Sequence, residues 1–92
     1  MTVRQYVLGQ LAQECAEVAH RASKAQHFGM DEIEPGQALT NRVRLQGELD
    51  DLIAVAEMLD LDIRPSNETR HAKHAKVTRM LGYARELGQV GA

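Results

Sequence analysis

Two pairs of acidic residues lie beside the apolar residues of a helical pattern, where a purely solubilising charge is poorly placed. Glu14 and Glu17 are three positions apart in one segment, and Glu48 and Asp51 are three positions apart in another. Each acid directly precedes an apolar residue of its own repeat, so both pairs fall at the edge of an apolar stripe. If the two segments pack antiparallel through these stripes, the four carboxylates can converge. Such a cluster must take up protons or bind a cation.

The chemistry of these side chains limits the choice of cation. Ligands that offer only oxygen select a hard ion, and Mg²⁺, which keeps water and phosphate oxygens in its shell, fits better than Zn²⁺. Acid pairs at this spacing are more often part of a solvated helix face. The spacing alone therefore leaves both a metal site and a solvated acidic face open.

The elements that must position these acids are predicted from apolar residues at spacings of three and four. Residues 3–26 form the first predicted helix, which Phe28 and Gly29 end. Its inward stripe is Leu8, Leu11, Cys15, Val18, Ala22 and Ala25. Residues 30–40 lack this periodicity and contain Pro35 and Gly36, which predicts a loop.

Two further helices are predicted from their capping residues. Thr40 or Asn41 begins the second helix, whose stripe is Leu45, Leu49, Leu52, Ala56 and Leu59. Residues 61–67 interrupt the pattern. Ser66 or Asn67 then begins a third helix that runs to about residue 88, with an inward stripe of Val77, Met80, Leu81, Ala84 and Leu87. We predict an all-α fold, a three-helix protomer with a long loop between the first two helices, in a single domain over residues 1–92.

Composition narrows the classes of partner. The chain has 92 residues, of which 43% are hydrophobic but only 3% aromatic, and a net charge of −2. This charge gives no general attraction to nucleic acid or to an anionic membrane. The single cysteine, Cys15, suits a reducing compartment, and no apolar run has the length of a membrane span or a signal peptide. We expect a cytoplasmic protein with neither a membrane nor a nucleic-acid partner.

Size predicts self-association. Three helices of this length cannot enclose their stripes together with Val55 and Met58, which spread the apolar surface of the second helix to its other side. We therefore expect an oligomeric helical bundle.

Basic residues also lie at the margins of the predicted stripes. Lys73 continues the inward line of the third helix and Lys76 sits on its edge, while Arg21 and Lys24 extend the acidic edge of the first helix by one and two turns. Each could contact the phosphates of a substrate. Alternatively, Lys73 and Lys76 belong to a solvated face, and Arg21 and Lys24 form ion pairs with nearby acids.

The two acidic segments, "QECAEVAHRASKAQHFG" and "NRVRLQGELDDLIAVAEML", resemble the signature of the MazG-like, all-α nucleoside triphosphate pyrophosphohydrolases. The resemblance covers about two thirds of the chain and includes Ser23-Lys24 and Phe28-Gly29 as well as the acids. It implies a homodimer or homotetramer that hydrolyses (deoxy)nucleoside triphosphates to the monophosphate and pyrophosphate with Mg²⁺, for which Mn²⁺ can substitute. It also implies that the metal ligands are Glu14, Glu17, Glu48 and Asp51.

On this interpretation Glu17 or Glu48 accepts the proton of the attacking water. The candidate substrate-binding residues are Arg21, Lys24, Phe28, Asn41, Lys73 and Lys76. Two alternatives remain. One is the related phosphoribosyl-ATP pyrophosphohydrolase activity. The other is a non-catalytic helical dimerisation or regulatory module whose acids are ion-paired with Arg21, Lys24 or Lys73.

Overall fold

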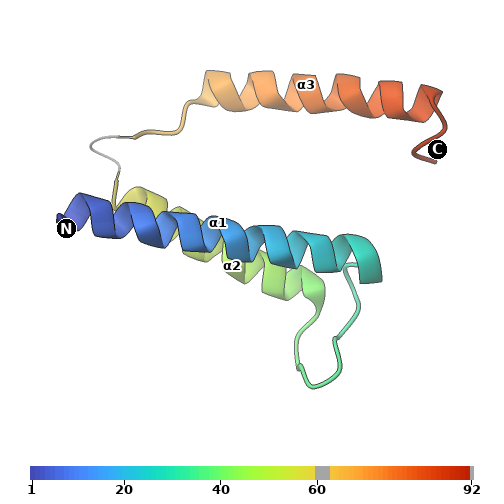
Figure 1. Cartoon of the computed structure of the whole chain (residues 1–92). Helices are drawn as coiled ribbons and strands as arrows, with labels where there is room; N and C mark the ends of the chain where they lie inside the picture. The colour runs from blue at the N-terminus through green and yellow to red at the C-terminus, as the bar shows by residue number, and fades with distance from the viewer. Residues whose placement is uncertain (60–62, 92) are drawn as a thin grey trace.

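Three helices make up the regular structure of the chain (Figure 1). The computed structural model describes residues 1–59 and 63–91, and within these ranges no strand is present. The helices are α1 (Val3–Phe28), α2 (Asn41–Glu57) and α3 (Asn67–Glu86). The prediction of an all-helical chain with three helices is confirmed. Residues 61 and 62 of the predicted interruption lie outside the described residues, whereas residues 63–66 are described and are not helical.

The first helix has well-defined ends. The Thr2 hydroxyl accepts a hydrogen bond from the backbone N–H of Gln5 at 3.1 Å, and Gln5 Oε1 accepts one from the N–H of Thr2 at 2.7 Å. This reciprocal capping box satisfies two donors that a helix start leaves without partners. At the other end Gly29 has a φ of 100°, a value that side chains with a Cβ rarely adopt. The helix therefore runs two residues beyond its predicted end and stops at the predicted glycine.

The caps of α2 and α3 decide between the residues that the sequence left as alternatives. The hydroxyls of Thr40 and Ser66 accept hydrogen bonds from the backbone N–H groups of Val43 and Thr69, each at 3.2 Å. Thr40 and Ser66 are therefore the N-caps. Asn41 and Asn67 are the first residues of the helices that follow.

The helices α1 and α2 pack against each other as an antiparallel hairpin, with residues 29–40 joining them (Figure 1). Among the described residues three apolar side chains, Val7, Ala25 and Leu59, are buried. Leu8, Cys15 and Leu49 belong to the predicted inward stripes but are exposed. The buried core is therefore small, as expected for two helices that cover each other on one side only.

The third helix stands apart from this hairpin (Figure 1). Within the described residues α3 packs against neither α1 nor α2, and none of its side chains is buried. Val77, Met80 and Leu87 are 50%, 59% and 53% exposed. The prediction that the stripe of the third helix faces a core is therefore wrong within a single chain. The Cα radius of gyration is 16.5 Å, against about 12 Å for a compact chain of this length.

Among the described residues, no helix combines the length and the apolar character that crossing a bilayer requires.

Candidate functional site

Antiparallel packing brings acids of α1 and α2 together. One carboxylate oxygen from each of Glu14, Glu17 and Glu48 lies within 4.8 Å of the other two. Glu14 and Glu17 come from neighbouring turns of α1, and Glu48 comes from the middle of α2. The two acidic edges therefore face each other across the hairpin, and three of the four predicted ligands form one cluster, which we call the glutamate cluster.

Asp51, the fourth predicted ligand, stands slightly outside the glutamate cluster. It lies three residues after Glu48 on α2, its side chain is exposed, and its oxygens are not among those that meet within 4.8 Å. It is still close enough for its negative charge to raise the pKa of Glu48. Asp51 is therefore a neighbour of the cluster on its solvent side.

The pKa of Glu48 is raised above its usual value of 4.5. The largest cause is a side-chain hydrogen bond with Glu17, which one of the two carboxyl groups can donate only when it is protonated. Partial burial raises the pKa further, as do the negative charges of Glu17 and Asp51, while the positive charge of Arg21 lowers it. The hydrogen bond, burial and the two negative charges together therefore outweigh the lowering effect of Arg21 on the pKa of Glu48.

Two oxygen atoms of the glutamate cluster have no hydrogen-bond donor. Oε2 of Glu14 and Oε2 of Glu48 are both enclosed, and neither has a partner among the described residues. An enclosed acceptor without a donor is unfavourable, since it has lost its water and gained nothing in exchange. Oxygen-only ligands of this kind match the preference of Mg²⁺ or Mn²⁺. The residues present therefore fit a hard divalent cation.

An open pocket of about 420 Å³ lies beside the cluster. Its lining includes Glu17, His20, Arg21 and Glu48, so acidic and basic groups border the same space. Arg21 borders this pocket, and its predicted contact with a phosphate stays a prediction. His20 borders the pocket but was not among the candidate residues.

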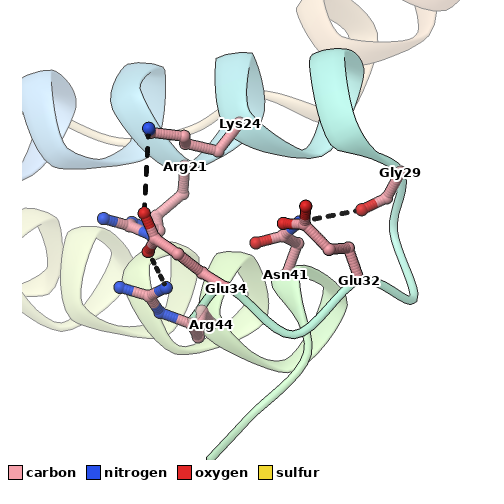
Figure 2. Close-up of polar contacts among 7 residues, drawn as sticks. All are labelled: Arg21, Lys24, Gly29, Glu32, Glu34, Asn41 and Arg44. Atoms are coloured by element: carbon pink, nitrogen blue, oxygen red, sulfur yellow. Dashed lines mark hydrogen bonds and ion pairs between the residues drawn. The ribbon is translucent and has the colours of Figure 1, made fainter. Parts of the chain in front are cut away.

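Arg21 and Lys24 meet a loop residue that the sequence did not single out. Arg21 Nη1 and Lys24 Nζ lie 4.0 Å and 3.8 Å from the carboxylate of Glu34, and Arg44 Nη1 donates a hydrogen bond to Glu34 Oε2 at 2.9 Å (Figure 2). The pKa of Glu34 is lowered, chiefly by the Arg44 hydrogen bond; burial opposes this lowering, and the positive charges of Lys24, Arg44 and Arg21 add to it. Glu34 and Arg44 are the residues that sequence reasoning missed. Glu34 lies in a loop without helical periodicity, so the sequence contains no signal that predicts these contacts.

Asn41 has a structural role that accounts for its side-chain amide. It is buried, and its Nδ2 donates hydrogen bonds to the carbonyl oxygen of Gly29 at 2.8 Å and to Glu32 Oε1 at 3.2 Å (Figure 2). Backbone hydrogen bonds from Asn41 N to Glu32 O and from Arg42 N to Met30 O fasten the same part of the loop to α2. Because its amide donors are engaged within the chain, the geometry argues against the predicted contact between Asn41 and a substrate.

The remaining substrate-binding candidates are Phe28 at the end of α1 and two lysines of α3. Phe28 ends α1 and is 52% exposed, with Lys24 Nζ 5.5 Å from its ring centroid and His27 packed edge-on at 4.7 Å. Lys73 and Lys76 are exposed residues of α3, which contacts neither α1 nor α2 within the described residues. One chain therefore does not bring these two lysines to the glutamates, and their role stays a prediction.

Comparisons with family models, with curated proteins and with solved structures found no match to this chain. The interpretation of the site accordingly depends on its geometry and on the sequence resemblance described above.

Proposed function

We propose that this chain is a MazG-like nucleoside triphosphate pyrophosphohydrolase that acts with Mg²⁺, or with Mn²⁺ in its place. The observation that carries the proposal is the convergence of Glu14, Glu17 and Glu48, with two enclosed oxygen atoms lacking donors. Rigid helices hold these carboxylates, so the cluster is built before any ligand arrives. Its substrate would be a (deoxy)nucleoside triphosphate, and its products the monophosphate and pyrophosphate.

The residues of the site divide the chemistry among them. The three glutamates would hold Mg²⁺, with Asp51 beside them as a further carboxylate. The ion would supply positive charge to neutralise the phosphates and would make a water molecule more acidic. Glu17 or Glu48 accepts the proton of the water. Arg21, at the border of the pocket, orients a phosphate.

The rest of the substrate site is proposed to require more than one chain. The apolar stripe of α3 is uncovered, which supports a homodimer or homotetramer in which α3 packs on another copy. In such an assembly Lys73 and Lys76 could reach the phosphates from the second chain. The exposed ring of Phe28 could stack on the base.

The proposal is tested by removing ligand charges one at a time. Glu48→Gln and Asp51→Asn should each lower pyrophosphate release by about 10²-fold or more, since each removes a metal ligand and the first removes a candidate base. The matched control is Asp50→Asn, an exposed neighbour outside the cluster that should leave the activity unchanged. A panel of nucleoside triphosphates and phosphoribosyl-ATP serves as substrate, and circular dichroism verifies the helical fold. Activity within a few-fold of wild type in the Glu48 or Asp51 variant would refute the metal-site assignment.

A non-catalytic dimerisation module is the second candidate, and the uncovered stripe of α3 is the observation that favours it. That alternative requires the acids to be neutralised by ion pairs. In the described part of the chain, however, the ion pairs of Arg21 and Lys24 are with Glu34 and not with the glutamate cluster. Isothermal titration with Mg²⁺ or Mn²⁺ separates the two candidates, because only the enzyme requires saturable binding of the cation.

A further inference from the structure

Three cations converge on the single carboxylate of Glu34. Arg21 and Lys24 approach it from α1 and Arg44 approaches from α2, at 4.0, 3.8 and 2.9 Å (Figure 2). The two arginine side chains are only 14% and 17% exposed, whereas the side chain of Glu34 is 35% exposed. Three positive charges thus share one negative charge, and the two guanidinium groups are the more enclosed partners. Lys24 and Arg44 add two positive charges at this carboxylate, while the charge of Arg21 also acts on Glu48 of the glutamate cluster.

One of these cations connects this position to the glutamate cluster. Arg21 also borders the pocket that Glu17 and Glu48 line, so the carboxylate of Glu34 lies next to the proposed metal site. Its Nη1 is enclosed and makes no hydrogen bond with the described residues, although Glu34 lies 4.0 Å away. The guanidinium therefore has unused donor capacity at the point where the two sites meet.

The hydrogen bonds of Asn41 and the Arg42 backbone, which anchor the loop to α2, do not involve Glu34. Asn41 and the backbone of Arg42 fasten residues 29–32 to α2. Beyond this anchor, Glu34 begins a tight turn in which the N–H of Gln37 donates to its carbonyl at 2.9 Å, with Pro35 second and Gly36 third at a φ of 87°. This is the pattern of a type II turn. Displacing Glu34 therefore need not break any hydrogen bond made by Asn41.

We propose that Arg21, Lys24 and Arg44 form a binding site for a phosphate group of a polyphosphate ligand, and that Glu34 occupies this site as an internal competitor. The carboxylate stands where a phosphate oxygen would bind, and an incoming phosphate displaces it. A phosphate offers more charge and more acceptor oxygens than a carboxylate, and it can engage both guanidinium groups with paired hydrogen bonds. The anion site follows from the three cations alone; its assignment to the phosphates of a nucleotide rests on the proposed function.

The test measures anion binding without metal or catalysis. Inorganic tripolyphosphate is titrated calorimetrically into the full chain, without divalent cations, for wild type, Glu34→Gln and Asp31→Asn. Asp31 is the matched control because it lies in the same loop and pairs at 3.1 Å with Arg42, outside the three-cation site. Glu34→Gln should tighten binding by roughly three- to tenfold, as expected for removing a competing charged partner, while Asp31→Asn should change it less than about twofold.

Two further variants secure the interpretation. Arg44→Gln introduced into the Glu34→Gln chain should abolish the gain in affinity. Glu34→Asp keeps the charge of the loop but shortens the side chain, so it should tighten binding to a smaller extent and serves if Glu34→Gln does not fold. Equal tightening in the Glu34 and Asp31 variants, or no tightening in any Glu34 variant, would overturn the inference.

Failure of this inference and failure of the proposed function give different results. Suppose that replacing Glu34 tightens tripolyphosphate binding, but that the chain releases no pyrophosphate from any triphosphate. This result would support the anion site and refute the proposed enzymatic function. Suppose instead that the chain releases pyrophosphate, but that replacing Glu34 does not change its affinity for tripolyphosphate. This result would support the enzymatic function and refute the role of Glu34 as a competitor.

Discussion

Glu17 of α1 and Glu48 of α2 place carboxylate oxygens within 4.8 Å of each other across the helical hairpin. The hydrogen bond between their side chains is the largest cause of the raised pKa of Glu48. At neutral pH the same packing that buries the apolar residues of α1 and α2 therefore brings like charges together. The approach of these like charges lowers the stability of the folded chain, a cost that is common at functional sites.

Replacing Glu48 by glutamine should raise the thermal stability of the metal-free protein at pH 7. The folded pKa of Glu48 lies above the unfolded value of 4.5. The favourable contribution of this group is therefore fully present below pH 4.5 and is lost as the pH rises through the folded pKa. The melting temperature of Glu48→Gln, followed by circular dichroism, should exceed that of wild type at pH 7 and converge with it near pH 4. Asp50→Asn serves as the control, and a gap of constant size across this range would contradict the prediction.

Glu34 should show the opposite dependence. Its pKa is lowered in the folded chain, chiefly by the Arg44 hydrogen bond, so its contribution is present above the unfolded value of 4.5 and is lost as the pH falls through the folded value. Glu34→Gln should therefore melt at a lower temperature than wild type at pH 7, and the difference should shrink in acid below pH 4.5. An equal difference at pH 7 and in strong acid would show that packing, and not the ion pairs, is responsible.

Asn41→Asp should destabilise the hairpin by about 1–3 kcal/mol, the usual cost of leaving a buried polar group without a partner. The new carboxylate cannot donate to the carbonyl of Gly29 and would face the acidic Glu32. Asn67→Asp is a matched control, since Asn67 is also the first residue of its helix but is exposed. Urea unfolding measures both free energies. Equal losses of unfolding free energy in the two variants would mean that the hydrogen bonds from Asn41 to the loop make no specific contribution to stability.

Lys73→Ala should weaken nucleotide binding and leave Mn²⁺ binding unchanged, because its proposed partner is a phosphate oxygen. Two titrations of the variant measure this: Mn²⁺ alone, then a non-hydrolysable triphosphate with Mn²⁺ present. If Lys73 instead neutralises the acids of another chain, its removal should tighten Mn²⁺ binding and lower the melting temperature. Unchanged nucleotide binding would reject the phosphate role.

The protein should be at least a dimer at micromolar concentration, because the apolar stripe of α3 has no cover within the chain. Static light scattering gives the mass directly. Met80→Lys places a charge in the middle of that stripe and should shift the mass towards the monomer, whereas Lys76→Gln alters a residue at its edge and should not. A wild-type monomer with full activity would contradict both the prediction and the proposed arrangement of the substrate site.

The sequence predicted those features that local patterns control. Helical periodicity located all three helices, and the position of the acids relative to the apolar residues predicted their convergence, because antiparallel packing of two helices leaves few ways to arrange their edges. Gly29 was recognised as the end of α1 from its residue type alone. In the structure the side chain of Asp51 is more exposed than that of Glu48. Residue spacing along a helix does not predict this difference in exposure.

Contacts between distant residues could not be predicted in the same way. Thr40 and Asn41 are both good capping residues, and the choice between them depends on Gly29 and Glu32, which occupy the amide of Asn41. The cations around Glu34 come from two helices and meet only after the loop has folded back. Apolar periodicity locates the stripe of α3, but the prediction that this stripe faces a core within the chain is wrong, because periodicity does not encode which surface a helix packs against.

The separation of α3 from the hairpin also determines the order of folding. The two helices of the α1–α2 hairpin belong to one chain and are joined by residues 29–40, so their packing is a unimolecular step. A 20-residue helix without tertiary contacts is only marginally stable in water. The ordering of α3 therefore follows an encounter with another apolar surface, and in the proposed oligomer that encounter is second order. Refolding then divides into a fast phase that dilution does not affect and a slower phase whose rate rises with protein concentration.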